Sequence, residues 1–319
     1  MNFKKKIIFG LSISFLLIIT LSSCKKKKAF KDENAQISVD TRMFQGQTDQ
    51  AMADINLAIM GQPLLRGRSS ELSETTLEVI CGLEQDTSLV YQGIFRLIYN
   101  GIPCHGVKRV GEVVVTFIDY PLSKWKNAGT NLKIDFIGYK CSWESNGQSI
   151  QLDGSMNLRN ESGKTWYDLQ FLNEPKLDQI LTGNDIKITF SADNYTNISL
   201  NRRMEYTYSS SSKITTCKID GLGSQDGESS LENWGFTRDG LKFTNTVNAS
   251  IIWRTSCGAV APIDGQETIK VEDKAHELKS TFSFDNQGNE LVGDNPCPYG
   301  WRVEWSYKNK TNSRLFSFQ

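Results

Sequence analysis

Histidine is nearly absent from this chain, with two residues among 319, and no Cys-x-x-Cys spacing occurs. A zinc site needs three or four cysteine, histidine or carboxylate ligands at suitable spacing. A Cys-His or Ser-His catalytic pair would have to use His105 or His276, and the Gly-x-Ser-x-Gly nucleophile turn is also missing. We therefore expect no metal site, no cofactor and no nucleophilic catalysis.

A surplus of positive charge is missing as well, because 36 basic residues balance 36 acidic ones. Nucleic-acid-binding domains typically carry a basic face, so no nucleic-acid partner is expected. The apolar segment Ile7–Leu21 is also short for a membrane span. It has 15 residues, whereas a transmembrane helix needs roughly 20.

The first 24 residues contain the three segments of an export signal. Lys4, Lys5 and Lys6 precede the apolar run, which ends in Leu21-Ser22-Ser23-Cys24. A charged start, a short apolar middle and small residues before the cut are what the export machinery recognises. The last four residues resemble the bacterial lipobox. That resemblance implies that signal peptide 1–23 is removed and that Cys24 is lipidated, with fatty acyl chains such as palmitate.

A basic run, Lys25–Lys28, follows the cysteine. Each lysine near an anionic bilayer contributes on the order of 1 kcal/mol to membrane binding. In the sorting rule of enteric lipoproteins an aspartate after the cysteine means inner-membrane retention, and Lys25 is not aspartate. We therefore expect a lipid anchor in the outer membrane, in the periplasmic or the surface-exposed leaflet. A plain signal peptide with an incidental cysteine is the alternative.

The hydrophobic pattern changes along the mature chain. Residues 24–47 are polar without a period, which predicts a flexible tether behind the lipidated cysteine. Residues 48–75 are predicted to hold a short helix and a linker, with Thr48 or Asp49 as the cap. The apolar face of this helix would consist of Ala51, Ile55, Ala58 and Ile59.

From Leu77 onward apolar and polar residues alternate, as in Leu132, Ile134 and Phe136. This period of two indicates half-buried strands. The predicted fold class is all-β, with antiparallel β-sandwich-like sheets and one short N-terminal helix. Two packed units are expected, a first β unit at 76–172 and a second at 185–319.

Two hairpins are predicted from Asx-Gly pairs, which suit a two-residue type I′ loop. A loop at Asn146-Gly147 would place Trp143 opposite Ile150 and Cys141 opposite Leu152. Both pairs are apolar, so turn and pattern favour the same register.

The second loop, Asp239-Gly240, would place Phe236 opposite Phe243. The following strand alternates regularly up to Trp253. Only Asn245 and Ile252 break that alternation.

Six cysteines remain after lipidation of Cys24, an even number that suggests disulfides in an oxidising compartment. Pairing within each half is the economical arrangement. It predicts the bridges Cys81–Cys104, Cys257–Cys297 and Cys141–Cys217. Cys141 would pack equally well as a free thiol beside Trp143, and a set of buried free thiols is the alternative throughout.

Aromatic residues line one face of a C-terminal strand, namely Tyr299, Trp301, Trp305 and Tyr307. If exposed, these rings would stack on sugars and form a glycan-binding face. If buried, they are core, and large exposed apolar patches are rare on soluble proteins. We favour the core.

Carboxylates beside aromatics, such as Asp168, Glu144 and Glu304, would suit a glycosidase, which needs two carboxyls roughly 5 to 10 Å apart. The glycine-rich stretch 221–227 lacks the following helix and lysine of a phosphate loop, so we interpret it as an ordinary exposed loop.

A set of short motifs lies along the chain from Leu77 to its end, namely Cys81-Gly82, Gly111 through Trp125, Ala128-Gly129, Asn160-Glu161-Ser162-Gly163, Trp234-Gly235, Cys257-Gly258 and Cys297-Pro298-Tyr299-Gly300. On these motifs the chain resembles uncharacterised outer-membrane lipoproteins of one Gram-negative lineage. No assigned activity comes with this resemblance. We expect a non-enzymatic binding or structural module with a glycan or protein ligand. A glycan-binding lipoprotein for nutrient uptake and a hydrolase are the alternatives.

Overall fold

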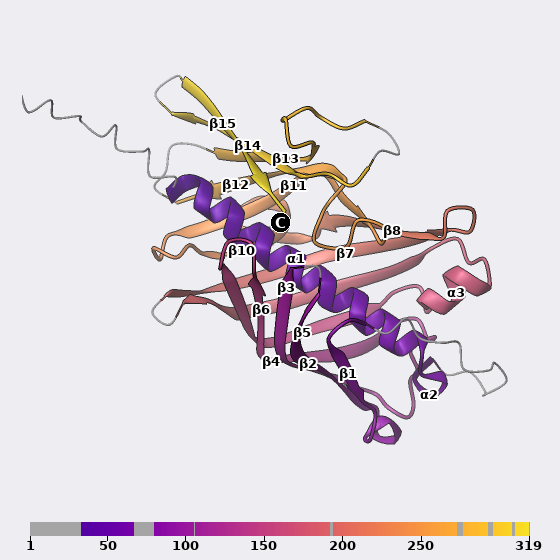
Figure 1. Cartoon of the computed structure of the whole chain (residues 1–319). Coiled ribbons are helices and arrows are strands. Elements are labelled where there is room, and N and C mark those ends of the chain that lie inside the picture. Colours follow the sequence, from indigo (N-terminus) through magenta and orange to yellow (C-terminus); the bar gives the residue numbers. More distant parts are fainter. Residues whose placement is uncertain are drawn as a thin grey trace, which may run out of the picture.

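A computed structural model describes most of the chain (Figure 1). Cys24 with its signal, residues 67–79, which include the end of the predicted segment 48–75, His105 and His276 lie outside the described residues. The side chain of Tyr307 is likewise outside them. The described residues are 33–66, 80–104, 106–191, 194–272, 277–292, 296–307 and 310–318.

Within the described residues, fifteen antiparallel strands form one sheet in the order β1-β2-β3-β4-β5-β6-β7-β10-β11-β12-β13-β14-β15, while β8 pairs with β7 and β11, and β9 pairs with β10. The all-β class with antiparallel pairing is thereby confirmed. The strands are β1 (Leu83–Asp86), β2 (Ile94–Cys104), β3 (Val107–Phe117), β4 (Thr130–Trp143), β5 (Ser149–Asn160), β6 (Leu177–Ser191), β7 (Asn194–Ser209), β8 (Ile214–Gly221), β9 (Gly223–Gln225), β10 (Glu228–Phe236), β11 (Lys242–Arg254), β12 (Asp264–Val271), β13 (Glu277–Phe284), β14 (Gly300–Tyr307) and β15 (Lys310–Ser317).

The strands of both predicted units belong to this one sheet. The expected connection between the units, 173–184, overlaps β6, which continues through the predicted boundary at residue 185 and pairs with β5 and β7. Gly183 belongs to an irregularity in this strand, where the register shifts before Ile186. The glycine and polar residues that predict a connection at 173–184 thus belong, from Leu177 onward, to a bulged strand.

A long helix, α1 (Glu33–Met60), lies along the inner face of the sheet, as the indigo ribbon in Figure 1 shows. The other helices are short, namely η1 (Val90–Gln92), α2 (Pro63–Arg66) and α3 (Trp166–Phe171). None of the helices in the described part of the chain is both long and apolar enough to cross a membrane.

The predicted start of the helix is wrong, because α1 begins 15 residues before Thr48 and includes residues 33–47 of the expected tether. Thr48 and Asp49 do not cap it but lie buried in its middle. The sequence hides this helix because its buried face is largely polar. Its apolar residues, including Phe44, Ile55 and Ile59, join the strands in one hydrophobic core.

The polar side chains of α1 pair with strands on all sides. Asp54 accepts hydrogen bonds from Tyr99 of β2 and Arg109 of β3, at 2.8 and 2.6 Å. The Ser38 hydroxyl oxygen lies 3.0 Å from the hydroxyl oxygen of Ser280 in β13. The same Ser38 hydroxyl accepts a hydrogen bond from the Trp301 indole of β14 at 3.2 Å. Because these partners come from strands near both ends of the strand order, the sheet curves around the helix.

The Asn146-Gly147 hairpin has a different register from the predicted one. Cys141 faces Ile150, and the Trp143 amide donates to the Gln148 carbonyl, so the loop has four residues rather than two. Of the two residues of the predicted loop, Gly147 has a positive φ, at 68°, and Asn146 does not. A type I′ turn requires a positive φ at both, so this turn is of another type. The shift moves the partner strand by two residues. Apolar alternation survives such a shift, and therefore the pattern could not detect it.

The Asp239-Gly240 hairpin also has a longer loop, because the Thr237 amide donates to the Leu241 carbonyl across three residues. Phe236 consequently faces Lys242, and Gly235 faces Phe243. The predicted aromatic pair is absent. This shift of one residue turns Phe236 outward, where it is 42 % exposed, while Phe243 is buried.

Two predicted disulfides are confirmed. Cys81–Cys104 and Cys257–Cys297 are bonded, with α-carbons 6.0 and 5.2 Å apart. The third predicted bridge, Cys141–Cys217, is wrong, since both residues are buried free thiols. Cys141 points inward from β4 and donates to the Gln47 side chain of α1, which occupies the space between the strands.

Candidate functional site

The C-terminal aromatic stripe is mainly core. Trp301 and Trp305 are 4 % and 6 % exposed, and Trp301 stacks against both Phe316 and Phe318. Tyr299 is 39 % exposed at the end of this row. These residues therefore do not form the exposed glycan-stacking face that was the alternative to a core.

The carboxylates singled out beside aromatics are not brought together. Asp168 lies in the first turn of α3, where it and Thr165 form a reciprocal capping box. Glu144 lies in the β4–β5 loop, and Glu304 lies in β14 opposite Lys279. Among the described residues no group of three or more histidine, cysteine or acidic side chains could hold a metal ion.

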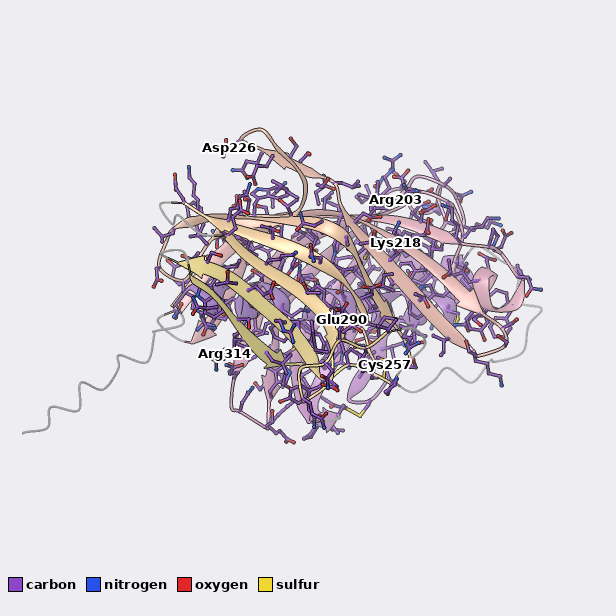
Figure 2. The ribbon with its side chains drawn as sticks, turned by 90° about the horizontal axis from the view of Figure 1, so that it is seen from above. Arg203, Lys218, Asp226, Cys257, Glu290 and Arg314 are labelled. Atoms are coloured by element: carbon purple, nitrogen blue, oxygen red, sulfur yellow. A yellow bond between two sulfur atoms is a disulfide. The ribbon has the colours of Figure 1, made fainter. Side chains whose placement is uncertain are left out.

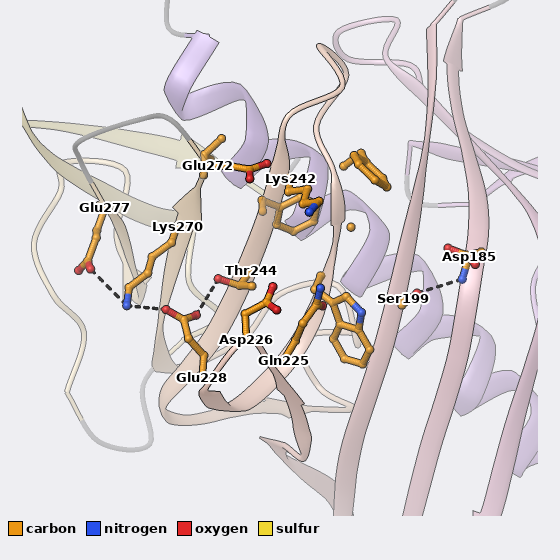
Figure 3. Close-up of a pocket in the computed structure, with 15 residues that line it drawn as sticks. Asp185, Ser199, Gln225, Asp226, Glu228, Lys242, Thr244, Lys270, Glu272 and Glu277 are labelled. Carbon is orange, nitrogen blue, oxygen red and sulfur yellow. Dashed lines mark hydrogen bonds and ion pairs between the residues drawn. The ribbon is translucent and has the colours of Figure 1, made fainter.

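A cavity of about 620 Å³ opens on the face of the sheet that points away from α1 (Figure 3). Its floor contains a row of directly paired residues that crosses five strands, β7, β10, β11, β12 and β13. The row consists of Ser199, Trp234, Thr244, Lys270 and Glu277. We call this cavity the Trp234 pocket.

A second row lies beside the first. Phe236 of β10 pairs with Lys242 of β11, and the backbone amide of Glu272 donates to the Lys242 carbonyl at 2.8 Å. Since side chains two residues apart on a strand share a face, the rings of Trp234 and Phe236 both belong to the pocket floor. The pocket therefore combines two aromatic rings with ionised side chains.

The β9–β10 hairpin forms a wall of the pocket. Asp226 and Gly227 have φ values of 51° and 85°, as a type I′ turn requires, and they join Gln225 to Glu228. Figure 2 shows Asp226 at the projecting tip of this hairpin. Gly223 of β9 permits a close approach, because a Cβ there would lie 2.5 Å from the Trp234 ring. The hairpin thus fixes Trp234 in place.

Glu228 ties the hairpin to the sheet. Its carboxylate accepts hydrogen bonds from Thr244 at 2.8 Å and from Lys270 at 2.7 Å, and Lys270 also lies 3.5 Å from Glu277 (Figure 3). The Lys270 ammonium lowers the pKa of Glu228, and Glu228 in turn raises the pKa of Lys270. Both groups stay charged at neutral pH, so this ion pair holds the β9–β10 hairpin against β12.

A second polar cluster lies inside the protein, between α1 and the opposite face of the same strands. The Gln45 side chain donates to the carboxylates of Glu232 and Glu267, the latter at 2.9 Å. Asn245 of β11, one of the two residues that break the strand alternation, also donates to Glu267 at 2.9 Å. All four side chains are at most 1 % exposed. This cluster holds the helix and is closed to ligands.

Sequence reasoning missed the Trp234 pocket. The sequence contains both Trp234-Gly235 and the glycine-rich stretch 221–227, but nothing in it indicates that they lie together. The stretch was interpreted as an exposed loop, whereas it contains β9 and the Asp226-Gly227 turn. The available signal was that Asp-Gly pair, which forms the type I′ loop expected elsewhere.

No family model, curated protein or solved structure matches this chain.

Proposed function

We propose that this protein is a lipid-anchored, non-enzymatic binding protein of the outer membrane or cell surface, and that its ligand occupies the Trp234 pocket. The observation that carries the proposal is the cavity of about 620 Å³ with aromatic rings in its floor. Ligand sites are concave, and a few hundred cubic ångströms suit a small molecule or a short peptide. The location follows from the lipobox resemblance at Cys24.

The length of chain between anchor and fold is consistent with a module close to the membrane. Eight residues, 25–32, lie between Cys24 and Glu33, where α1 begins. Even fully extended, such a segment spans only roughly 30 Å. With Cys24 anchored in the bilayer, the start of α1 would lie within this distance of the membrane surface.

The charged groups of the pocket favour binding over hydrolysis. A general acid at neutral pH needs a raised carboxyl pKa, whereas contact with Lys270 lowers the pKa of Glu228. Both carboxylate oxygens of Glu228 already accept hydrogen bonds, one from Thr244 and the other from Lys270. These contacts give this carboxylate a structural role.

A glycan is a specific second candidate for the ligand. Trp234 and Phe236 lie two residues apart on the same face of β10, and Phe236 is 42 % exposed. Sugar rings stack on such aromatic surfaces. The glycan hypothesis thus moves from the buried Trp301 and Trp305 to these two residues.

A ligand screen on the mature chain tests the proposal. We expect a compound from a panel of sugars, peptides and amines to raise the melting temperature, and Trp234→Ala to abolish the shift. Tyr91→Ala is the matched control, because Tyr91 is 76 % exposed and lies outside the pocket. A ligand whose effect survives Trp234→Ala would place binding elsewhere and overturn the proposal.

A further inference from the structure

The walls of the Trp234 pocket carry more negative than positive charge. Five carboxylates and two lysines line it. Lys270 is already paired with Glu228 and Glu277, at 2.7 and 3.5 Å. The carboxylates that remain are Asp185, Asp226 and Glu272, and the remaining lysine is Lys242. A ligand therefore meets a net negative potential.

The uncharged polar groups of the pocket add to this acceptor character. The side-chain carbonyl oxygen of Gln225 is buried and has no hydrogen-bond partner in the described part of the chain. Ser199 already uses its hydroxyl oxygen to accept from the Asp185 amide at 3.0 Å. This oxygen costs free energy while it is buried and unpaired, and a turn of the half-buried Gln225 amide toward the cavity would let a hydrogen-bond donor of the ligand satisfy it.

Aromatic rings lie beside these acceptors. Trp234 and Phe236 project from β10 into the cavity that Asp226 and Glu272 also line, and Lys242 of β11 lies between Phe236 and Glu272 in the second row. The face of an indole or phenyl ring attracts a cation and also covers an apolar chain. Figure 3 shows Gln225 and Asp226 reaching from the hairpin over this floor.

Building on the proposed binding function, we propose that the Trp234 pocket takes an organic cation, an ammonium or guanidinium group carried on an apolar stem. The charged end would pair with Asp226 and Glu272 and donate to Gln225. The stem would lie across Trp234 and Phe236. An anion would be repelled by the surplus of carboxylates, and a neutral sugar would leave that charge uncompensated. The same chemistry occurs in free polyamines and in the basic side chains of a peptide.

A matched series of small probes tests the charge requirement. Hexanediamine, hexanediol and adipate share one chain length and differ in the charge of their ends. We expect binding by calorimetry for hexanediamine only, and we expect its affinity to fall as salt is raised, because salt screens exposed charges. Spermidine then represents a free polyamine, and a trilysine amide represents the basic side chains of a peptide. The one that binds with the higher affinity indicates which of these two classes of ligand the pocket takes.

Variants locate the contact. Asp226→Asn combined with Glu272→Gln should weaken hexanediamine binding about tenfold, which corresponds to about 1.4 kcal/mol. Glu84→Gln is the control, because Glu84 is an exposed acid on β1 far from the pocket in the strand order. All variants change surface residues, so an unchanged melting temperature shows that they fold.

The outcomes separate this inference from the broader proposal. If hexanediol or a neutral sugar binds in a Trp234-dependent way and hexanediamine does not, the pocket is a ligand site and the cation inference is overturned. Amine binding that survives both Trp234→Ala and the double acid variant would overturn the inference and place the site elsewhere. Absence of amine binding at low salt also overturns it.

Discussion

Arg202 and Asp49 form an ion pair inside the protein, with 2.7 Å between a guanidinium nitrogen and a carboxylate oxygen, and each side chain is 1 % exposed. Asp49 lies in the middle of α1, and Arg202 points inward from β7. The same guanidinium lies 2.8 Å from Glu232 of β10. One arginine thus joins the helix to two neighbouring strands.

Arg202→Met should destabilise the protein by about 3 to 5 kcal/mol, because it leaves the buried Glu232 without its arginine partner and Asp49 with only the longer 3.4 Å contact to Arg42. Urea unfolding of the mature chain measures this loss. Arg203→Met is a matched control on the next residue. Arg203 is 46 % exposed and pairs with Asp178 at 3.0 Å, so its loss should cost about 0 to 1 kcal/mol. Equal effects at both positions would contradict the anchoring role of Arg202.

Glu267 should make stability depend on pH. Burial, and then the charge of Glu232, raise the pKa of Glu267 above its ordinary 4.5. Between 4.5 and the folded-state pKa the folded chain holds a proton that the unfolded chain has lost. Rising pH therefore lowers the stability contribution of Glu267 across this window, and the contribution is constant above it.

The variant Glu267→Gln keeps the size of the side chain and removes this titration. We expect its unfolding free energy, relative to the unmodified protein, to rise as pH increases from 4.5 toward 8. Urea titrations across this range, with Glu290→Gln as the exposed control, measure the trend. A pH-independent difference for Glu267→Gln would show that Glu267 titrates alike in both states.

Cys24 should carry the whole membrane attachment. Cys24→Ser cannot form the thioether, so we expect the protein to leave the membrane fraction or to accumulate as an uncleaved precursor. Fractionation and intact-mass analysis check both results. Mature, membrane-bound protein with an unmodified Cys24 would refute the lipid anchor. The charged start and the Leu21-Ser22-Ser23-Cys24 sequence motivate this prediction.

Alternation of apolar residues was sufficient to predict the strands but not the position of α1. Leu132, Ile134 and Phe136 are all buried on β4, as predicted. Residues 33–47 looked like a solvated tether because burial of polar groups leaves no hydrophobic period. Asn245 was the one visible sign of this polar interior, since it interrupts an apolar face to reach Glu267.

The Trp234 pocket could not be predicted from the sequence for a different reason. Its floor row joins Ser199 to Glu277 through pairings across five strands. Those pairings depend on hairpin registers, and the Asp239-Gly240 register was wrong by one residue. This one-residue shift of register decides whether the Phe236 side chain points into the pocket or toward the core. Turn chemistry narrows the loop type, but it does not determine the loop length.

Gly147→Val should destabilise the β4–β5 hairpin by roughly 1 kcal/mol or more, because a β-branched residue is strained at φ 68°. A Cβ at this position meets nothing within 4 Å, so the cost comes from the backbone alone. Thermal and urea unfolding measure it. Gly147→Asn is the control, since asparagine tolerates the left-handed region better. Similar losses for valine and asparagine would argue against backbone strain.

Cys141 and Cys217 should behave as unreactive thiols in the folded protein. Burial raises the pKa of the Cys141 thiol to about 12, and the pKa of Cys217 is raised well above its ordinary value for the same reason. The thiolate is the reactive form, so alkylation at pH 8 should not modify either residue until the chain is unfolded. Unfolding without a reductant should then release two reactive thiols, while Cys81–Cys104 and Cys257–Cys297 stay bonded. Peptide mapping after alkylation identifies the labelled residues. A peptide that joins Cys141 to Cys217 would restore the third bridge, and it would require α1 to leave the space between β4 and β8.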